Sequence, residues 1–250
     1  MHKLTKWGLS LAGAGLLVMG GTWAVLGSRV EDLTTFSFGF PDSGNPWQDV
    51  KASYGAKEKV TSLDLETATG TVTIRQGKTF EIQTNGIKRA GSGEEDGHWT
   101  EFHTENGLAV FRTGQEGWQT VNGEEARIQV TIPETVKTVN VSVSMGSLSC
   151  HDLNLDTADL SVNMGDCDFQ GRVSRSLAAS VDMGNGSLDL QMPQARLDLS
   201  VDMGELTLNG RETEHDFMTS ALKTGNEGPA VTASVNMGNL NVSLQDKSRS

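Results

Sequence analysis

The chain has 250 residues, enough for one sizeable domain or two small ones. Its formal net charge of −12 excludes nucleic acid as a natural partner, because phosphates would be repelled, and favours cations and basic peptides. Charged residues make up 21% of the chain and 29 residues are glycine, a composition that excludes an acidic disordered protein and a collagen-like one. Two cysteines are too few for a disulfide scaffold.

The first predicted element is a membrane-spanning helix. Lys3 and Lys6 precede an uncharged apolar run over residues 7–27, whose roughly 20 residues are enough to cross a bilayer as a helix. Because positive charge favours the cytoplasmic side, we expect a cytoplasmic tip (1–6), a transmembrane signal anchor (7–27) and an extracellular remainder. The protein would then be a single-pass protein of the cell membrane. The alternative is a signal peptide that is cleaved after Gly27.

The segment that follows, residues 28–58, shows little periodicity. It is predicted to be a juxtamembrane spacer, or a cap on the first rung of the domain formed by residues 59–250. A cap would serve a purpose there, because the open end of a repeated sheet is prone to aggregation.

A repeated motif, Ser-Val-x-Met-Gly, occurs five times within residues 59–250. Its glycines are separated by 19, 19, 20 and 34 residues, and a period near 20 is typical of a solenoid in which each repeat forms one winding. The motif ends in Met145-Gly146, Met164-Gly165, Met183-Gly184, Met203-Gly204 and Met237-Gly238.

Apolar and polar residues alternate strictly on the N-terminal side of each glycine, a period that a half-buried strand satisfies. Valine and methionine are therefore expected to point into a dry core, with parallel windings stacked about 4.8 Å apart. Glycine is expected at a corner between two strands, because it tolerates backbone angles that a side chain forbids. The predicted fold is all-β, a single-stranded parallel β-helix-like solenoid with rungs of 19–20 residues, preceded by one transmembrane helix.

Three other parts of the domain depart from this pattern. A diverged sixth rung is centred on Gly70, where Thr67 and Thr69 replace valine and methionine. Residues 80–132 contain shorter alternating segments separated by polar turns, and they predict irregular rungs or a hairpin at one side. The interval of 34 residues before Gly238 predicts a rung with an insertion of roughly 14 residues.

These rungs, of the type Leu-x-Leu-x-Val-x-Met-Gly-x-Leu-x-Leu, resemble the bacterial "putative adhesin" family of β-strand-repeat proteins of unknown function. The preceding segment IPETVKTVNV and the N-terminal apolar run add to the resemblance, which covers roughly residues 60–245. The family is found mostly in cell-envelope proteins of Gram-positive bacteria. The resemblance implies a β-solenoid and, in some members, an association with envelope-stress or antimicrobial-peptide responses. It carries over no catalytic residue.

Asp182 and Asp202 occupy the same outward column in consecutive repeats, and we expect their carboxylates to lie about 5 Å apart. Such a pair can bind Ca²⁺, with neighbouring serines adding oxygen ligands, or can be screened by water on a solvated face. The same pair can serve acid–base chemistry on a polysaccharide, although rungs this short leave little chain for a walled groove. No other cofactor is expected.

The two cysteines are predicted to be buried free thiols. Both point inward in the predicted alternation, with Cys150 stacked on Phe169 and Cys167 on Leu148. This register separates their Cα atoms by about 8 Å, which is beyond disulfide reach.

Together these features predict a membrane-anchored, extracytoplasmic β-solenoid that acts as a non-catalytic binding or sensing module of the cell envelope. The expected partners are the membrane, through the N-terminal anchor, and an envelope protein or a cationic peptide. One alternative is a surface adhesin or structural spacer. A third is a polysaccharide-active β-helix enzyme.

Overall fold

The structure, a computed structural model, describes residues 51–87, 98–115, 126–213, 215–216, 219–225 and 227–245. All of them belong to one compact unit, Thr35–Ser250, and their regular elements are all β-strands, so the fold is all-β as predicted. No helix in these ranges is long and apolar enough to cross a membrane. The predicted anchor (7–27) and most of the predicted spacer (28–58) lie outside the described residues.

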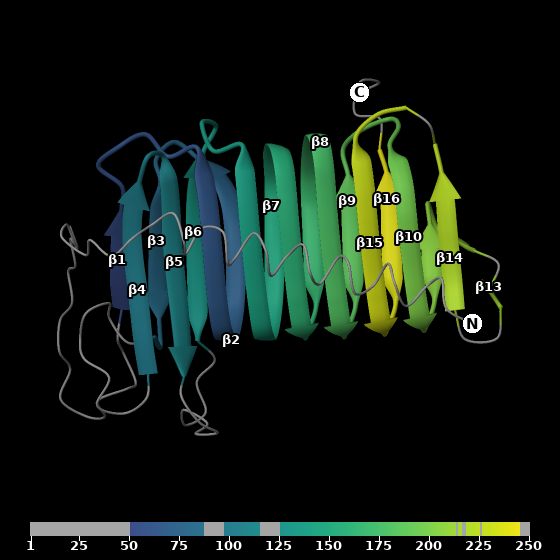
Figure 1. The fold of residues 1–250 in the computed structure, drawn as a ribbon, viewed down its shortest axis with the longest axis horizontal. Coiled ribbons are helices and arrows are strands. Elements are labelled where there is room, and N and C mark those ends of the chain that lie inside the picture. The colour runs from purple at the N-terminus through teal and green to yellow at the C-terminus, as the bar shows by residue number, and fades with distance from the viewer. Residues whose placement is uncertain are drawn as a thin grey trace. The chain divides into compact units, whose positions relative to one another are not determined.

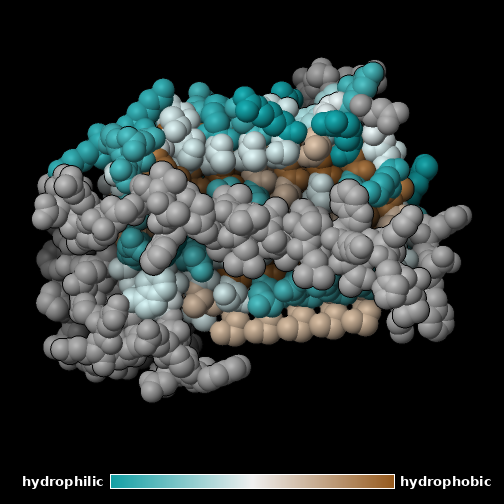
Figure 2. All heavy atoms as spheres, viewed as in Figure 1, coloured by the Kyte–Doolittle hydropathy of each residue, from teal (hydrophilic) through white to brown (hydrophobic). Residues whose placement is uncertain are grey.

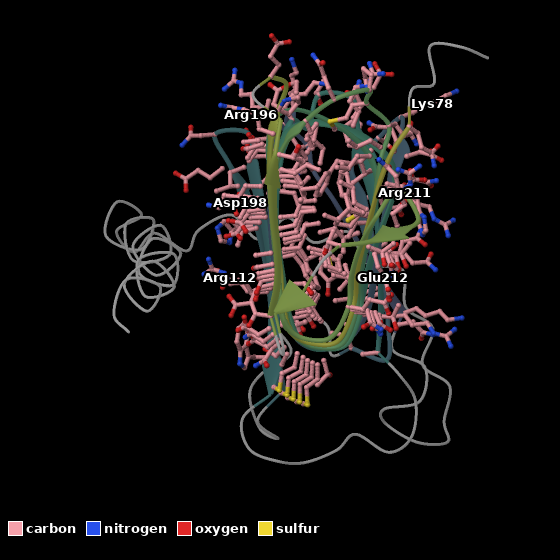
Figure 3. The ribbon with its side chains drawn as sticks, turned by 90° about the vertical axis from the view of Figure 1, so that its right-hand side faces the viewer. Lys78, Arg112, Arg196, Asp198, Arg211 and Glu212 are labelled. Atoms are coloured by element: carbon pink, nitrogen blue, oxygen red, sulfur yellow. The ribbon has the colours of Figure 1, made fainter. Side chains whose placement is uncertain are left out.

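The strands form one continuous sheet that folds around a corner into two facing walls, with apolar side chains packed between them (Figures 1 and 3). In spatial order the first wall begins with β4 (His98–Glu105), β5 (Leu108–Gln115) and the first half of β2 (Ser62–Gly77). It continues with two windings of β7 (Thr138–Met164) and the second half of β8 (Cys167–Met183). It ends with β15 (Ala230–Met237), β10 (Arg196–Met203), β14 (Thr219–Thr224) and β13 (His215–Asp216). The second wall, in the same direction, begins with β1 (Lys51–Gly55), β3 (Glu81–Asn85), β6 (Arg127–Pro133) and the second half of β2. The parts of β7 and β8 beyond the corner follow. The wall ends with β9 (Gly186–Leu190), β16 (Leu240–Leu244), β11 (Leu206–Leu208) and β12 (Arg211–Glu212).

The repeats stack as parallel strands in register, which confirms the predicted ladder. In the pairing of β2 with β7, Thr67 lies opposite Val143, Thr69 opposite Met145, and Gly70 opposite Gly146. The segment around Gly70 is therefore a true winding in which threonine takes the places of valine and methionine.

The windings at the C-terminal end do not stack in chain order. β15 lies between β8 and β10, so that Met237 faces Met183 on one side and Met203 on the other. The expectation that the windings of Asp182 and Asp202 are neighbours is therefore wrong. Every rung carries the same alternation, so the ladder accepts the rungs in either order, and the predicted insertion gives the chain enough length to return between two existing windings. In spatial order the corner glycines are Gly70, Gly146, Gly165, Gly184, Gly238 and Gly204.

Antiparallel strands close both ends of the coil. β14, which belongs to the insertion, pairs antiparallel with β10 and covers the outer edge of the first wall. At the other end β4 and β5 form an antiparallel hairpin, and β3 and β1 add antiparallel strands beside β6. The segments predicted as irregular rungs or a hairpin thus interrupt the parallel ladder at its end, which limits edge-to-edge association.

The methionine column points to solvent, which corrects the prediction of a dry methionine ladder. The five motif methionines are 38–50% exposed, whereas the five motif valines, two residues earlier, are at most 3% exposed. The strand bends at the corner, so the two residues before the glycine both lie on its convex side and the alternation breaks there. The valine column is buried as predicted.

The corner glycines bring the backbones of neighbouring windings into contact. Gly184 has a φ of 138°, and a Cβ atom placed on it would lie only 1.9 Å from the carbonyl oxygen of Gly165. Its N–H donates a hydrogen bond to the carbonyl oxygen of Met237 at 2.9 Å, so the ladder continues through the corner. A residue with a side chain can satisfy neither the φ angle nor this close approach.

Replacing a corner glycine should therefore destabilise the coil strongly. For Gly184→Ala we expect a loss of about 2–6 kcal/mol in the free energy of unfolding, the sum of about 1–3 for backbone strain and about 1–3 for overpacking. Urea unfolding followed by circular dichroism measures this loss. The control is Gly55→Ala, because Gly55 has an ordinary φ and its nearest neighbouring atom would lie 4.0 Å from the added methyl group. Equal effects of the two substitutions would contradict the stacked corner.

Candidate binding surface

Five methionines form a straight apolar ridge along the corner of the coil. Figure 2 shows this row along the lower edge of the view, and Figure 3 shows stacked side chains that end in sulfur at the same corner. We call it the methionine ridge; in spatial order it consists of Met145, Met164, Met183, Met237 and Met203. These are the large hydrophobic side chains that stand exposed in the described part of the chain.

Carboxylate, amide and hydroxyl side chains flank the ridge on both sides. One flank consists of Ser144, Asn163, Asp182, Asn236 and Asp202, and the other of Ser147, Asp166, Asn185, Asn239 and Glu205. Asp182, Asp202, Asp166 and Glu205 bear negative charge, and none of these ten positions holds a lysine or arginine. The surface is thus an apolar line between two acidic or neutral columns.

A ladder of side-chain hydrogen bonds fixes the second flank to the backbone. Asp166 Oδ1 accepts hydrogen bonds from the backbone N–H of Asn185 at 2.9 Å and from its Nδ2 at 3.0 Å. Asn185 Oδ1 accepts one from the N–H of Asn239 at 3.2 Å, and Asn239 Oδ1 one from the N–H of Glu205 at 3.0 Å. Each winding thus holds the next at the corner, and the ladder follows the same spatial order as the glycines.

The structure does not bring together the two carboxylates that were predicted to share a Ca²⁺ ion. Asn236 lies between them, and its Nδ2 donates a hydrogen bond to Asp182 Oδ1 at 2.9 Å. Asp182 and Asp202 are therefore two strand spacings apart, about 9.6 Å. One Ca²⁺ ion with bonds of about 2.3–2.6 Å cannot bridge that distance. Within the described ranges, no three His, Cys, Asp or Glu side chains cluster closely enough to hold a metal ion.

The cysteine prediction is confirmed. Cys150 lies opposite Phe169 and Cys167 opposite Leu148, and both thiols are free and buried. Loss of hydration raises the pKa of Cys167 to about 12, with a smaller contribution from the nearby charge of Asp168. Burial also raises the pKa of Cys150 well above its usual value. Both side chains therefore behave as small apolar core residues.

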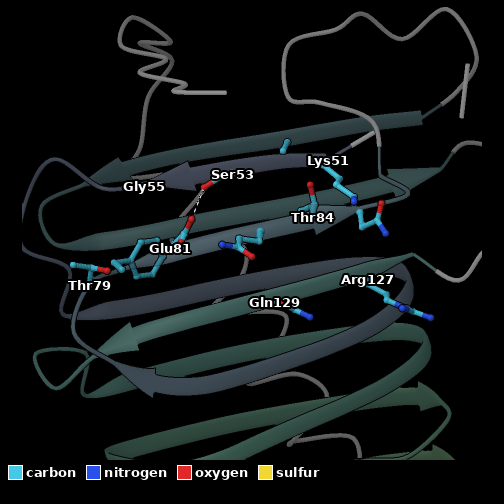
Figure 4. A pocket seen from close by; sticks show the side chains of 12 residues that line it. Lys51, Ser53, Gly55, Thr79, Glu81, Thr84, Arg127 and Gln129 are labelled. Carbon is cyan, nitrogen blue, oxygen red and sulfur yellow. Dashed lines mark hydrogen bonds between the residues drawn. The ribbon is translucent and has the colours of Figure 1, made fainter. Parts of the chain in front are cut away.

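A shallow depression of about 660 Å³ lies on the outer face of β1, β3 and β6 (Figure 4). Lys51 and Arg127 line it together with Glu81, which accepts a hydrogen bond from Ser53 Oγ at 2.7 Å. Hydrogen bonds from Gln83 and Ser53 lower the pKa of Glu81. The depression combines both signs of charge in an open setting, and it lies outside the repeated windings.

The fold and this surface define a β-solenoid repeat protein whose repeated side chains line one exposed corner. The chain belongs to the Toastrack DUF4097 family, whose sequence profile matches residues 60–246. No curated protein sequence matches the chain significantly.

Two solved structures are among those similar to this chain. One, from Clostridium sporogenes and described as a "putative cell adhesion protein", has 13% sequence identity and a TM-score of 0.50, and the match covers 79% of this chain and 100% of that one. The other, a "putative adhesin" from Bacteroides fragilis, has 10% identity and a TM-score of 0.41, and covers 78% of this chain and 96% of that one. At such identities the first structure supports the fold alone.

The exposure of the ridge can be tested by substitution. Met183→Thr should change the free energy of unfolding by no more than about 0.5 kcal/mol, because the position is exposed and Thr69 occupies the equivalent place in the winding at Gly70. Val181→Ala, two residues earlier, should cost at least about 1.6 kcal/mol, since two buried methyl groups are lost. Comparable losses for the two variants, measured by urea unfolding, would place Met183 in the core.

The buried thiols predict a decline in stability at alkaline pH. A thiol in the unfolded chain ionises near pH 8.5, whereas the folded-state pKa values of Cys150 and Cys167 are raised. Their contribution is complete below pH 8.5 and is lost as the pH rises towards the folded-state pKa, at about 1.4 kcal/mol per pH unit per thiol. Urea unfolding between pH 8 and 11 should therefore show a shallower slope for Cys167→Ala than for the wild type. Parallel slopes would contradict a buried, protonated thiol.

Proposed function

We propose that this protein is a non-catalytic binding module of the bacterial cell envelope, held at the outer side of the membrane by its N-terminal segment. Its ligand is a cationic peptide or a basic segment of an envelope protein. The observation that carries the proposal is the corner surface: an exposed apolar ridge between two flanks that hold four carboxylates and no cation. An amphipathic basic peptide is complementary to such a surface, with apolar groups on the ridge and positive charge on the flanks.

The rigidity of the site supports the same proposal. The ridge stands on backbone hydrogen bonds between neighbouring windings, and one flank is tied to the backbone by the ladder from Asp166 to Glu205. A surface that is already ordered loses little conformational entropy on binding. A long, straight and repetitive site suits an extended or helical peptide better than a small molecule.

The experiment measures binding of a fluorescent amphipathic lysine–leucine peptide to the full chain in zwitterionic detergent, at low and high salt. In the test variant, Asp166→Asn, Asp182→Asn, Asp202→Asn and Glu205→Gln are combined. Asparagine already occupies equivalent positions in other windings, so this variant should fold. Four exposed ion pairs at about 0.2–1 kcal/mol each amount to about 1–4 kcal/mol, or a rise in Kd of at least about fourfold.

A control variant removes the same charge elsewhere. Glu105→Gln, Glu134→Gln, Glu212→Gln and Glu227→Gln replace four exposed carboxylates that lie outside the flanks. It should bind the peptide nearly as well as the wild type does. Equal weakening of both variants would show that net charge alone attracts the peptide, and absence of binding at every salt concentration would overturn the proposal.

A surface adhesin or a structural spacer is the second candidate. The Clostridium sporogenes structure, described as a "putative cell adhesion protein", shares the fold. The two candidates separate in cells. If the protein is an adhesin, cells lose attachment when it is deleted but keep attachment when it carries the four flank substitutions. If it is a peptide-binding module, both the deletion and the flank variant remove its phenotype.

A further inference from the structure

The methionine ridge is uniform in a way that the fold does not require. Thr69 takes the methionine position in the first winding, beside Gly70, with an unchanged register. The corner therefore forms without methionine. Buried columns accept a mixture of apolar residues, such as Val141, Leu160 and Ala179 at one equivalent position, or are uniform where packing selects one shape, as in the motif valine column. Packing of that kind does not act on a column that is 38–50% exposed. Five thioethers in one exposed column thus point to a property of the sulfur atom rather than of packing.

The spacing of the ridge matches a simple coordination geometry. Neighbouring methionines lie directly opposite each other in the parallel ladder, so equivalent atoms repeat about every 4.8 Å. Zinc–sulfur bonds in proteins are about 2.3 Å long, and two bonds of that length in a line span about 4.6 Å. An ion with two collinear ligands can therefore sit between the sulfurs of Met164 and Met183, or of Met237 and Met203, with no movement of the backbone.

The chemistry of the donors selects the ion. A thioether is soft and uncharged, so it binds Cu⁺ and its analogue Ag⁺ and leaves Mg²⁺ and Ca²⁺ in water or with oxygen ligands. The flanking carboxylates raise the local concentration of cations along the ridge. The buried thiols of Cys150 and Cys167 do not compete, because they are inaccessible and protonated.

We propose that the methionine ridge is a binding site for a soft monovalent metal ion, Cu⁺, held between the thioether sulfurs of methionines on neighbouring windings. Five methionines accommodate two such ions, with one thioether left over. This inference does not rest on the proposed peptide ligand. The metal is held by the sulfur atoms, and the flanking carboxylates only raise the local concentration of cations.

The test uses Ag⁺, which binds thioethers without redox chemistry. The full chain is titrated with Ag⁺, the bound metal is counted by mass spectrometry of the native protein, and the methionine methyl groups are followed by NMR. The test variant replaces all five ridge methionines by leucine, which keeps the ridge apolar and similar in size. The control is Met192→Leu, because Met192 is buried away from the ridge.

We expect about two Ag⁺ ions per wild-type chain and shifted methyl signals from ridge methionines only. Loss of a residue that only supports a metal ligand typically lowers metal affinity about 10- to 100-fold. The leucine variant lacks the ligands themselves, so its affinity for Ag⁺ should fall by more than that. Met192→Leu should bind as the wild type does. Undiminished Ag⁺ binding by a folded leucine variant, or no binding by the wild type, would overturn the inference. Lysine–leucine peptide binding that survives the leucine substitutions would leave the proposed function intact in either case.

Discussion

The structure depends on backbone contact between windings at the glycine corner. The five motif glycines have φ angles of 137–147°, and the absent side chain leaves room for the carbonyl group of a neighbouring glycine. At Gly70, where φ is 118°, it leaves room for the carbonyl group of Ala126. The N–H of Gly165, Gly184 and Gly238 each donates to the methionine carbonyl of the adjacent winding. This contact holds the two walls in one register, and the register in turn aligns the buried valines and the exposed methionines.

Stacking in register makes the interior and the exterior follow different rules. Inside, most columns need only apolar volume, and so alanine, valine, leucine, cysteine and phenylalanine replace one another among the windings, although the motif valine column is uniform. Outside, stacked carboxylates would repel one another, and amides relieve this repulsion. Asn236 separates Asp182 from Asp202, while Asn185 and Asn239 separate Asp166 from Glu205. The interleaved amides let the corner carry charge and remain rigid.

The return of the chain between two windings has a further consequence for the end of the coil. Because β15 and β16 lie between earlier windings, the C-terminal end of the repeat region is not at the edge of the coil, and the insertion supplies β14 as the covering strand. The last parallel edge of the first wall is therefore occupied by an antiparallel strand of the same chain. A coil closed in this way presents its corner and its outer faces to partners in place of its ends.

The alternation and the period of the repeats were sufficient to predict parallel windings, the buried valine column, the glycine corner, the diverged winding at Gly70 and the two separated thiols. These features follow from local periodicity and from stacking like on like. The direction of the methionines and the order of the last two windings were decided only in three dimensions. Alternation in sequence cannot show where a bend puts two successive residues on its convex side. Equivalent rungs have the same pattern and can pair with any other rung, so the sequence does not determine which windings become neighbours. The exposed methionine ridge and the separation of Asp182 from Asp202 both follow from those two decisions.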